Sequence, residues 1–93
     1  MNLTGRDIEA LRIKFKFPRL MLDDAVNYKY GGVFKILCID WNAHYVLIHT
    51  SQRMGREDYR QFWAHLNDVT LAGGLHNYKA VRLISSYLKY KQL

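Results

Sequence analysis

Two short apolar runs, rich in β-branched and aromatic residues, constrain the fold of this chain most strongly. They cover residues 33–39 and 45–49, and residues 40–44 between them include the Asp and Asn that are typical of turns. Runs of this kind around a turn predict an antiparallel β-hairpin. Residues 27–30 precede the glycine pair Gly31-Gly32 and are a candidate third strand, with the two glycines forming a turn or bulge.

The N-terminal segment carries the signals of a helix start within residues 3–17. Thr4 is a candidate N-cap, and Asp7 stands where a capping box has its acid. Apolar residues then recur at helical spacing, namely Ile8, Leu11 and Phe15. Residues 13–17 also alternate with the period of a strand, so the sequence leaves residues 12–17 open between helix and strand.

The second half of the chain predicts two further helices. Tyr59, Phe62, Trp63 and Leu66 fall on one helical face, which predicts a helix from Arg56 to Leu66 after a loop at 51–55. Gly73-Gly74 then breaks the chain. Asn77 is a candidate N-cap for a final helix that reaches about Tyr90, although alternation around Arg82 leaves residues 79–90 open to a strand.

These elements predict an α+β fold in one domain that covers residues 1–93. An N-terminal helix, a small antiparallel sheet built on the central hairpin and two C-terminal helices would enclose one core. The predicted core residues are Ile8, Leu11, Phe34, Ile36, Cys38, Val46, Ile48, Tyr59, Phe62, Trp63, Leu66, Val81, Ile84 and Leu88.

The net charge of +6 favours a polyanionic partner, either a nucleic acid or an acidic protein surface. Tyrosines alternate with lysines in Tyr28-Lys29-Tyr30 and again in residues 87–91. Aromatic faces stack on bases while neighbouring cations neutralise phosphates. The leading hypothesis is therefore a small basic nucleic-acid-associated binding module, with RNA as the candidate ligand.

Two clusters of basic residues are the candidate nucleic-acid contacts. One surrounds the predicted loop and helix start, where His49 could assist in RNA cleavage as a variant of the same hypothesis. The other follows the C-terminal quarter, in which no acidic residue comes after Asp68. The candidate binding residues are Lys35, Arg53, Arg56, Arg60, Lys79, Arg82 and Lys89.

Residues 30–62 resemble the second half of the HigB/RelE-type ribonuclease toxins. Lys29 to Ile36 would correspond to the entry of the hydrophobic hairpin, and Glu57-Asp58-Tyr59 to the polar end. The chain departs from that pattern at Met54-Gly55-Arg56, where such toxins often carry a Thr-His pair. The resemblance implies ribonuclease activity, with Lys35, Arg53, Arg56 and Tyr59 as the residues that would act.

Several classes of site have no support in the sequence. The four histidines and the single Cys38 lack metal-ligand spacing, and Cys38 is expected to be a small buried hydrophobe. The glycine pairs lack a phosphate-loop pattern, and no serine stands in a nucleophile motif. We expect no cofactor, and we expect a binding role rather than an enzymatic one. No apolar run reaches membrane-spanning length, so a cytoplasmic location without a membrane partner is expected.

An alternative of another class is a small inhibitor or adaptor, of the type that phages and mobile elements encode, which docks on a larger host enzyme. Trp and Tyr anchor protein interfaces. Trp41 lies in the predicted hairpin turn, where burial is hard to arrange, and Tyr45 follows it. A homodimer would be another way to cover such a surface.

Overall fold

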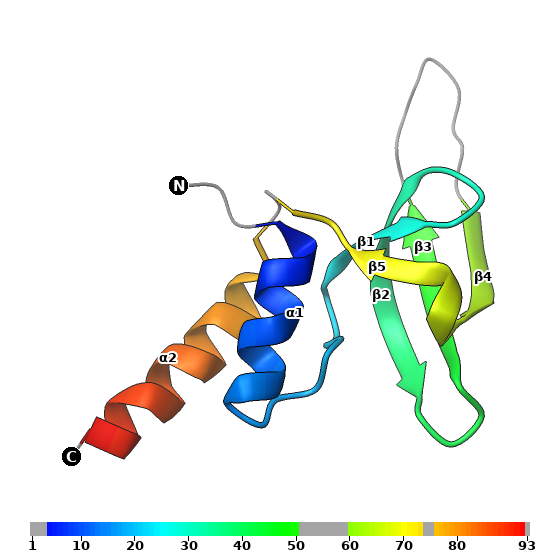
Figure 1. Cartoon of the computed structure of the whole chain (residues 1–93). Helices are drawn as coiled ribbons and strands as arrows, with labels where there is room; N and C mark the ends of the chain where they lie inside the picture. Colours follow the sequence, from blue (N-terminus) through cyan, green and yellow to red (C-terminus); the bar gives the residue numbers. More distant parts are fainter. Residues whose placement is uncertain (1–3, 51–59, 74–75, 93) are drawn as a thin grey trace.

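The computed structural model describes residues 4–50, 60–73 and 76–92, and within them the chain has an α+β fold, as predicted (Figure 1). The elements are α1 (Gly5–Lys14), β1 (Ala25–Tyr28), β2 (Val33–Asp40), β3 (Tyr45–Thr50), β4 (Arg60–His65), the single-turn 3₁₀ helix η1 (Leu66–Asp68), β5 (Val69–Leu71) and α2 (Tyr78–Gln92). The predicted hairpin is confirmed as β2 and β3. The prediction of three helices is wrong, because the described residues form two α-helices.

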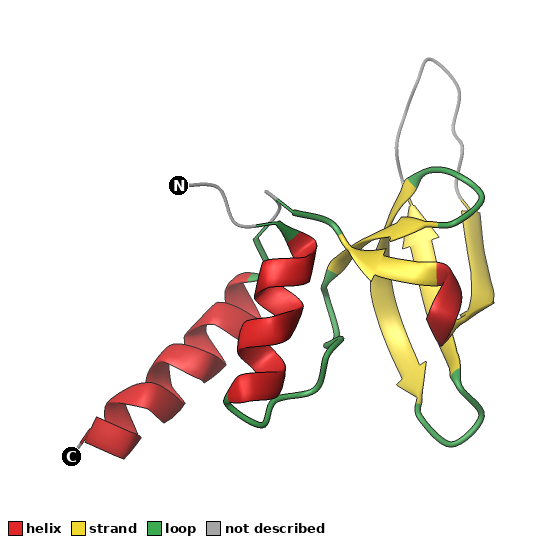
Figure 2. Ribbon diagram, in the orientation of Figure 1, coloured by secondary structure: helices red, strands yellow, loops and turns green. Residues whose placement is uncertain are grey.

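The five strands form one antiparallel sheet in the order β4-β3-β2-β1-β5. The first four strands follow one another as a meander, and β5 returns past η1 to pair with β1. In Figure 2 the two helices lie together on one side of this curled sheet, and the C-terminal end of α2 points away from it.

The helix predicted for residues 56–66 is wrong where the structure describes it. Residues 60–65 form β4 instead, which pairs with β3 from Tyr45 opposite His65 to Thr50 opposite Arg60. The helical spacing of the apolar residues reflects only a local preference. A strand at this position pairs with the backbone donors and acceptors at the edge of β3, which a helix cannot do. Pairing with β3 therefore outweighs the local preference for a helix. Residues 56–59, including Tyr59, lie outside the described residues.

The core lies inside the curl of the sheet. It consists of Leu20, Val26, Phe34, Ile36, Val46, Ile48, Ala64, Leu66, Val69 and Leu71. Phe34, Ile36, Val46, Ile48 and Leu66 are confirmed as predicted, while Ile8 and Phe62 are partly buried against this cluster.

Four residues predicted for the core are exposed instead: Leu11, Cys38, Trp63 and Val81. Cys38 lies at an irregularity of β2 between Ile36 and Cys38, which turns it outward, and Trp63 alternates with the inward Phe62 and Ala64. Ile84 and Leu88 on α2 are half-buried.

The predicted helix caps are present. The Thr4 hydroxyl accepts a hydrogen bond from the Asp7 backbone N–H at 3.2 Å, and the Asp7 carboxylate accepts one from the Thr4 N–H at 3.0 Å. The Thr4 N–H therefore lowers the pKa of Asp7, with the Thr4 hydroxyl assisting. Asn77 Oδ1 accepts from the Ala80 N–H at 3.2 Å and starts α2. In the two segments left open, helix covers residues 12–14 and 79–90, while residues 15–17 form neither helix nor strand.

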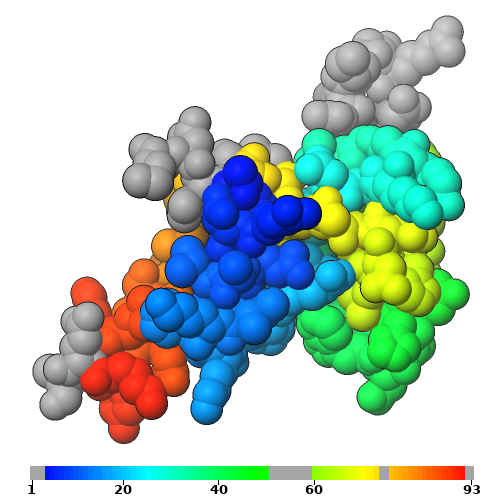
Figure 3. All heavy atoms as spheres, in the orientation of Figure 1, coloured from blue at the N-terminus to red at the C-terminus, as the bar shows by residue number. Residues whose placement is uncertain are grey.

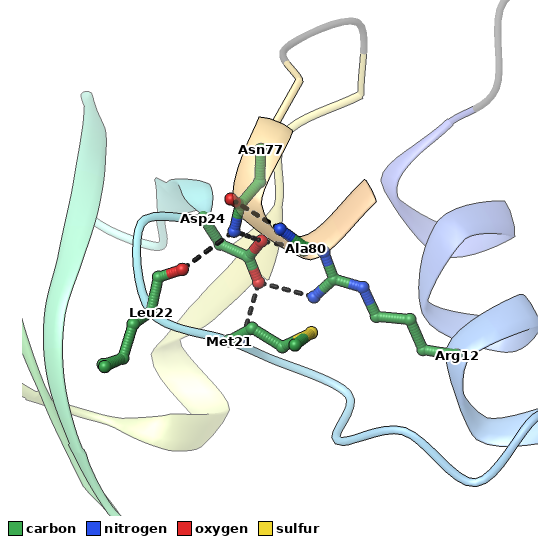
Figure 4. A network of polar contacts seen from close by, with 6 residues as sticks. All are labelled: Arg12, Met21, Leu22, Asp24, Asn77 and Ala80. Carbon is green, nitrogen blue, oxygen red and sulfur yellow. Dashed lines mark hydrogen bonds and ion pairs between the residues drawn. The ribbon is translucent and has the colours of Figure 1, made fainter. Parts of the chain in front are cut away.

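A buried polar network fixes the helices to the sheet (Figure 4). Asp24, just before β1, accepts hydrogen bonds from Arg12 of α1 at 2.6 and 2.8 Å. It also accepts from Asn77 Nδ2 at 2.7 Å and from the Met21 N–H at 2.7 Å. One carboxylate therefore joins α1, the start of α2 and the segment that leads into the sheet.

Candidate nucleic-acid interface

Four aromatic rings close one end of the sheet, beside the turn at Gly31-Gly32. Tyr28 contacts Phe34, Phe62 and Tyr30 with ring centroids 5.8, 5.1 and 5.4 Å apart, and Phe34 contacts Phe62 at 5.3 Å. Phe34 is buried, whereas Tyr30 is 72% exposed. The inner rings hold the outer one, so Tyr30 presents an aromatic surface to solvent on a fixed support.

The turn that carries Tyr30 depends on its glycines. Gly31 and Gly32 have φ angles of 113° and 96°, in the region that favours glycine. The Gly31 N–H donates to the Tyr28 carbonyl at 3.0 Å, and the Tyr28 N–H donates to the Gly32 carbonyl at 3.0 Å. The predicted turn is confirmed, and it folds Tyr30 back over Tyr28.

Two cations lie over these rings. Lys29 Nζ is 5.4 Å from the Tyr30 centroid, and Arg60 Cζ is 5.6 and 5.5 Å from the Phe34 and Phe62 centroids. Both side chains belong to exposed residues. Cations at this distance are attracted to the ring faces. The end of the sheet therefore combines exposed positive charge with an exposed ring, and we call Lys29, Tyr30 and Arg60 the aromatic-end group.

A second basic group forms where α2 begins. Asp23 binds Lys35 of β2 at 3.2 Å and Lys79 of α2 at 2.7 Å. These two hydrogen-bonded lysines, Lys79 first and Lys35 second, lower the pKa of the Asp23 carboxyl. A hollow of about 410 Å³ lies here, and His76 and Tyr78 also line it. Because the two lysines share a single carboxylate, Lys35, Lys79 and Asp23 together carry a net positive charge.

Helix α2 carries four cations and no acid: Lys79, Arg82, Lys89 and Lys91. Lys91 Nζ lies 5.7 Å from the Tyr87 ring, whose other contact is an edge-on packing against Phe17 at 5.2 Å. Tyr78 and Tyr90, near the two ends of the helix, are each 76% exposed. The helix thus presents rings and cations near both of its ends.

The structure brings together some of the predicted nucleic-acid residues and separates others. Lys35 and Lys79 meet at Asp23, and this connection could not be predicted from the sequence because 44 positions separate the lysines. Arg60 lies at the aromatic end, and Arg82 and Lys89 lie on α2. Arg53 and Arg56 lie outside the described residues, as does Tyr59, so of the residues that the toxin resemblance singled out only Lys35 is described.

The two predicted protein-interface residues lie on exposed apolar surface. Trp41 and Tyr45 are 45% and 44% exposed. Trp41 lines an apolar hollow of about 380 Å³ together with Pro18, Leu20, Met21, Leu22, Leu37, Cys38 and Ile39. Sequence reasoning missed Leu22 and Leu37, and it placed Cys38 in the core.

Among the described residues, no three His, Cys, Asp or Glu side chains are grouped so that they could hold a metal ion. Neither described helix combines the length and the apolar character that a bilayer crossing requires. Comparison with protein families, with curated proteins and with solved structures found no match to this chain.

Proposed function

We propose that this chain is a binding module for single-stranded nucleic acid, with the aromatic-end group as its centre. The observation that supports this most directly is the exposed Tyr30 ring, with Lys29 over it and Arg60 over the Phe34 and Phe62 rings of the same aromatic cluster. A base can stack on an exposed tyrosine, while Lys and Arg neutralise the phosphates on either side.

Single strands suit this surface better than a duplex. The bases of a duplex are already stacked on one another and offer only their edges. A ring supported by an aromatic cluster instead recognises the faces of unpaired bases, and it does so with little dependence on sequence. Stacking on one such ring contributes about 1–3 kcal/mol per base, which matters for a site of this size.

The positive charge of the rest of the chain would extend this contact. The net charge is +6, and the lysines and arginine of α2 carry no acidic neighbour within the helix. Each neutralised phosphate releases counterions, so affinity should fall steeply as salt is raised.

The first experiment is fluorescence anisotropy of labelled single-stranded RNA, single-stranded DNA and duplex DNA, titrated with the purified chain between 50 and about 300 mM salt. The expected result is binding to both single strands that weakens with salt, with weaker binding to the duplex. Equal affinity for all three at every salt concentration, or no binding, would contradict the proposal.

Matched variants separate the aromatic end from general charge. Tyr30→Leu keeps an apolar side chain but removes the stacking surface, and it should weaken binding by roughly tenfold, in line with the loss of one stacked base. Lys29→Gln and Lys14→Gln each remove one lysine that lies over a ring, at 5.4 and 5.7 Å respectively. Only Lys29 belongs to the aromatic end, so Lys29→Gln should weaken binding more than its control.

A second candidate function is protein docking, favoured by the exposure of Trp41 beside the apolar hollow. Exposed apolar patches on small proteins mark interaction surfaces. An inhibitor or adaptor of a larger enzyme would use this surface and leave the aromatic end free. Pull-down of tagged chain from nuclease-treated lysate, repeated with Trp41→Ala, distinguishes this function: a partner that is lost with Trp41→Ala but kept with Tyr30→Leu would support it.

A further inference from the structure

The outer face of β2, β3 and β4 carries an apolar row that no described element covers. Leu47 of β3 pairs with Cys38 on one side and with Trp63 on the other, so the three side chains share one face. Cys38 is exposed, Trp63 is 50% exposed and Leu47 is half-buried. The row continues past Leu37 into the hollow that Trp41 lines.

Charged residues of opposite sign flank this row on β2. The irregularity between Ile36 and Cys38 inserts one residue, so Lys35 and Asp40 both point outward although five positions separate them. Ile36 and Ile39 between them point toward the core. The outward order along β2 is therefore a cation, an apolar pair formed by Leu37 and Cys38, and an anion.

In a second copy that runs antiparallel, the anion lies opposite the cation of the first copy, and the apolar pairs lie opposite each other. We propose that two copies of the chain associate through this face, with a two-fold axis that passes between the Leu37–Cys38 pairs of the two β2 strands. The two strands then run antiparallel across the interface. Lys35, which binds Asp23 of its own chain at 3.2 Å and keeps 53% of its side chain exposed, then lies opposite Asp40 of the other copy. The same surface serves both copies, as a two-fold interface requires.

The apolar surface available suits a dimer contact. Trp41, Tyr45 and Trp63 leave on the order of 300 Å² exposed together, since each ring residue offers roughly 150–250 Å² and about half of it is uncovered. Leu22 and Leu37 add to this patch and are 55% and 39% exposed. This apolar patch would form the centre of the interface, and its polar rim would have to supply the rest of the roughly 800 Å² per partner that a specific interface buries.

The proposed dimer leaves the aromatic-end group free, and Lys35 is the one candidate nucleic-acid residue that its charge pairing uses. Tyr30 and Arg60 belong to the end of the sheet, not to the outward row, because Arg60 packs on the inward rings Phe34 and Phe62. Figure 3 shows the α2 surface extending away from the strands that form the sheet. A dimer would therefore carry two aromatic ends and two α2 helices on one assembly.

The test is sedimentation equilibrium of the unaltered chain over a range of concentrations, with charge-reversal variants. Lys35→Glu and Asp40→Lys each place like charges opposite one another, so each should weaken self-association by about tenfold or more. An equimolar mixture of the two variants restores both opposite-charge contacts, and it should form a mixed dimer. Lys14→Glu on α1 makes the same change in net charge as Lys35→Glu and should leave association unchanged.

Cys38 offers a second readout that needs no substitution. Facing sheets lie about 10 Å apart, which is too far for a disulfide but within reach of a short bis-maleimide. Cross-linking of Cys38 to Cys38 of the second copy should be efficient at concentrations where the dimer forms. A monomer at every concentration, or a dimer that neither variant weakens and no mixture restores, would overturn the proposal.

Discussion

Arg12 and Asp24 form a bidentate ion pair, with Nη1 2.6 Å from Oδ2 and Nη2 2.8 Å from Oδ1, and both residues are almost wholly buried. The pair joins the last turn of α1 to the segment that enters β1 (Figure 4). Charges removed from water must be matched by partners, and here Asn77 and the Met21 N–H complete the set around the carboxylate. The orientation of both helices on the sheet therefore depends on one side chain.

Asp24→Asn should be strongly destabilising. The substitution keeps the size of the side chain but leaves the Arg12 guanidinium buried without a countercharge, which costs about 3–5 kcal/mol. Urea unfolding followed by circular dichroism measures this loss. Glu9→Gln is the matched control, because Glu9 is partly exposed and its ion pair with Arg19, at 3.5 Å, lies near the surface. Equal effects of the two substitutions would contradict the assigned role of the buried pair.

Gly5→Ala should loosen the contact between α1 and β5. A Cβ at this position would overlap the Leu71 carbonyl, which belongs to the backbone and cannot rotate away. Overpacking of this kind costs about 1–3 kcal/mol, more than the helix propensity gained by replacing glycine. Hydrogen exchange should show faster opening of α1 amides.

Gly31→Ala provides the comparison for that experiment. A Cβ at Gly31 meets nothing within 4 Å, but the φ angle of 113° strains any side chain there. Its effect should stay in the turn between β1 and β2 and leave exchange in α1 unchanged. Faster exchange in α1 with both variants would argue against a specific α1–β5 contact.

The sequence was most informative where the signal is local. The Thr4–Asp7 box, the Asn77 cap and the glycine turn are each specified by residues a few positions apart, and each is confirmed. The strand β4 could not be predicted in this way, because its pairing with β3 is a long-range relationship that helical spacing around Phe62 concealed. The same holds for Cys38, whose outward position depends on an irregularity in β2.

In the candidate site, too, the local features could be predicted from the sequence and the long-range contacts could not. The alternation of Tyr28, Lys29 and Tyr30 is visible in the sequence, but nothing local indicates that Arg60 packs on the same ring cluster. The shared contact of Lys35 and Lys79 with Asp23 joins three distant segments, and only the fold creates it.

Acidification should release the lysines held by Asp23. Its pKa in the folded chain lies below the ordinary value of 3.8, because Lys79 and Lys35 bind the ionised form. A lowered folded pKa contributes stability that is fully present above pH 3.8 and is lost as the pH falls through the lower folded value. The urea midpoint of the unaltered chain should therefore drop more steeply below pH 3.8 than that of Asp23→Asn. Parallel curves for the two proteins would show that the lysine contacts contribute no stability.

Tryptophan emission should report self-association at the two positions separately. Trp41 and Trp63 are about half exposed, and both lie on the proposed dimer face. Burial against a second copy replaces water around each indole with apolar side chains. Trp41→Phe and Trp63→Phe each leave one emitter, and both single-tryptophan chains should shift to shorter wavelength as concentration rises. Adding Lys35→Glu should move that shift to higher concentration, whereas a shift confined to one tryptophan would place the contact on only that part of the face.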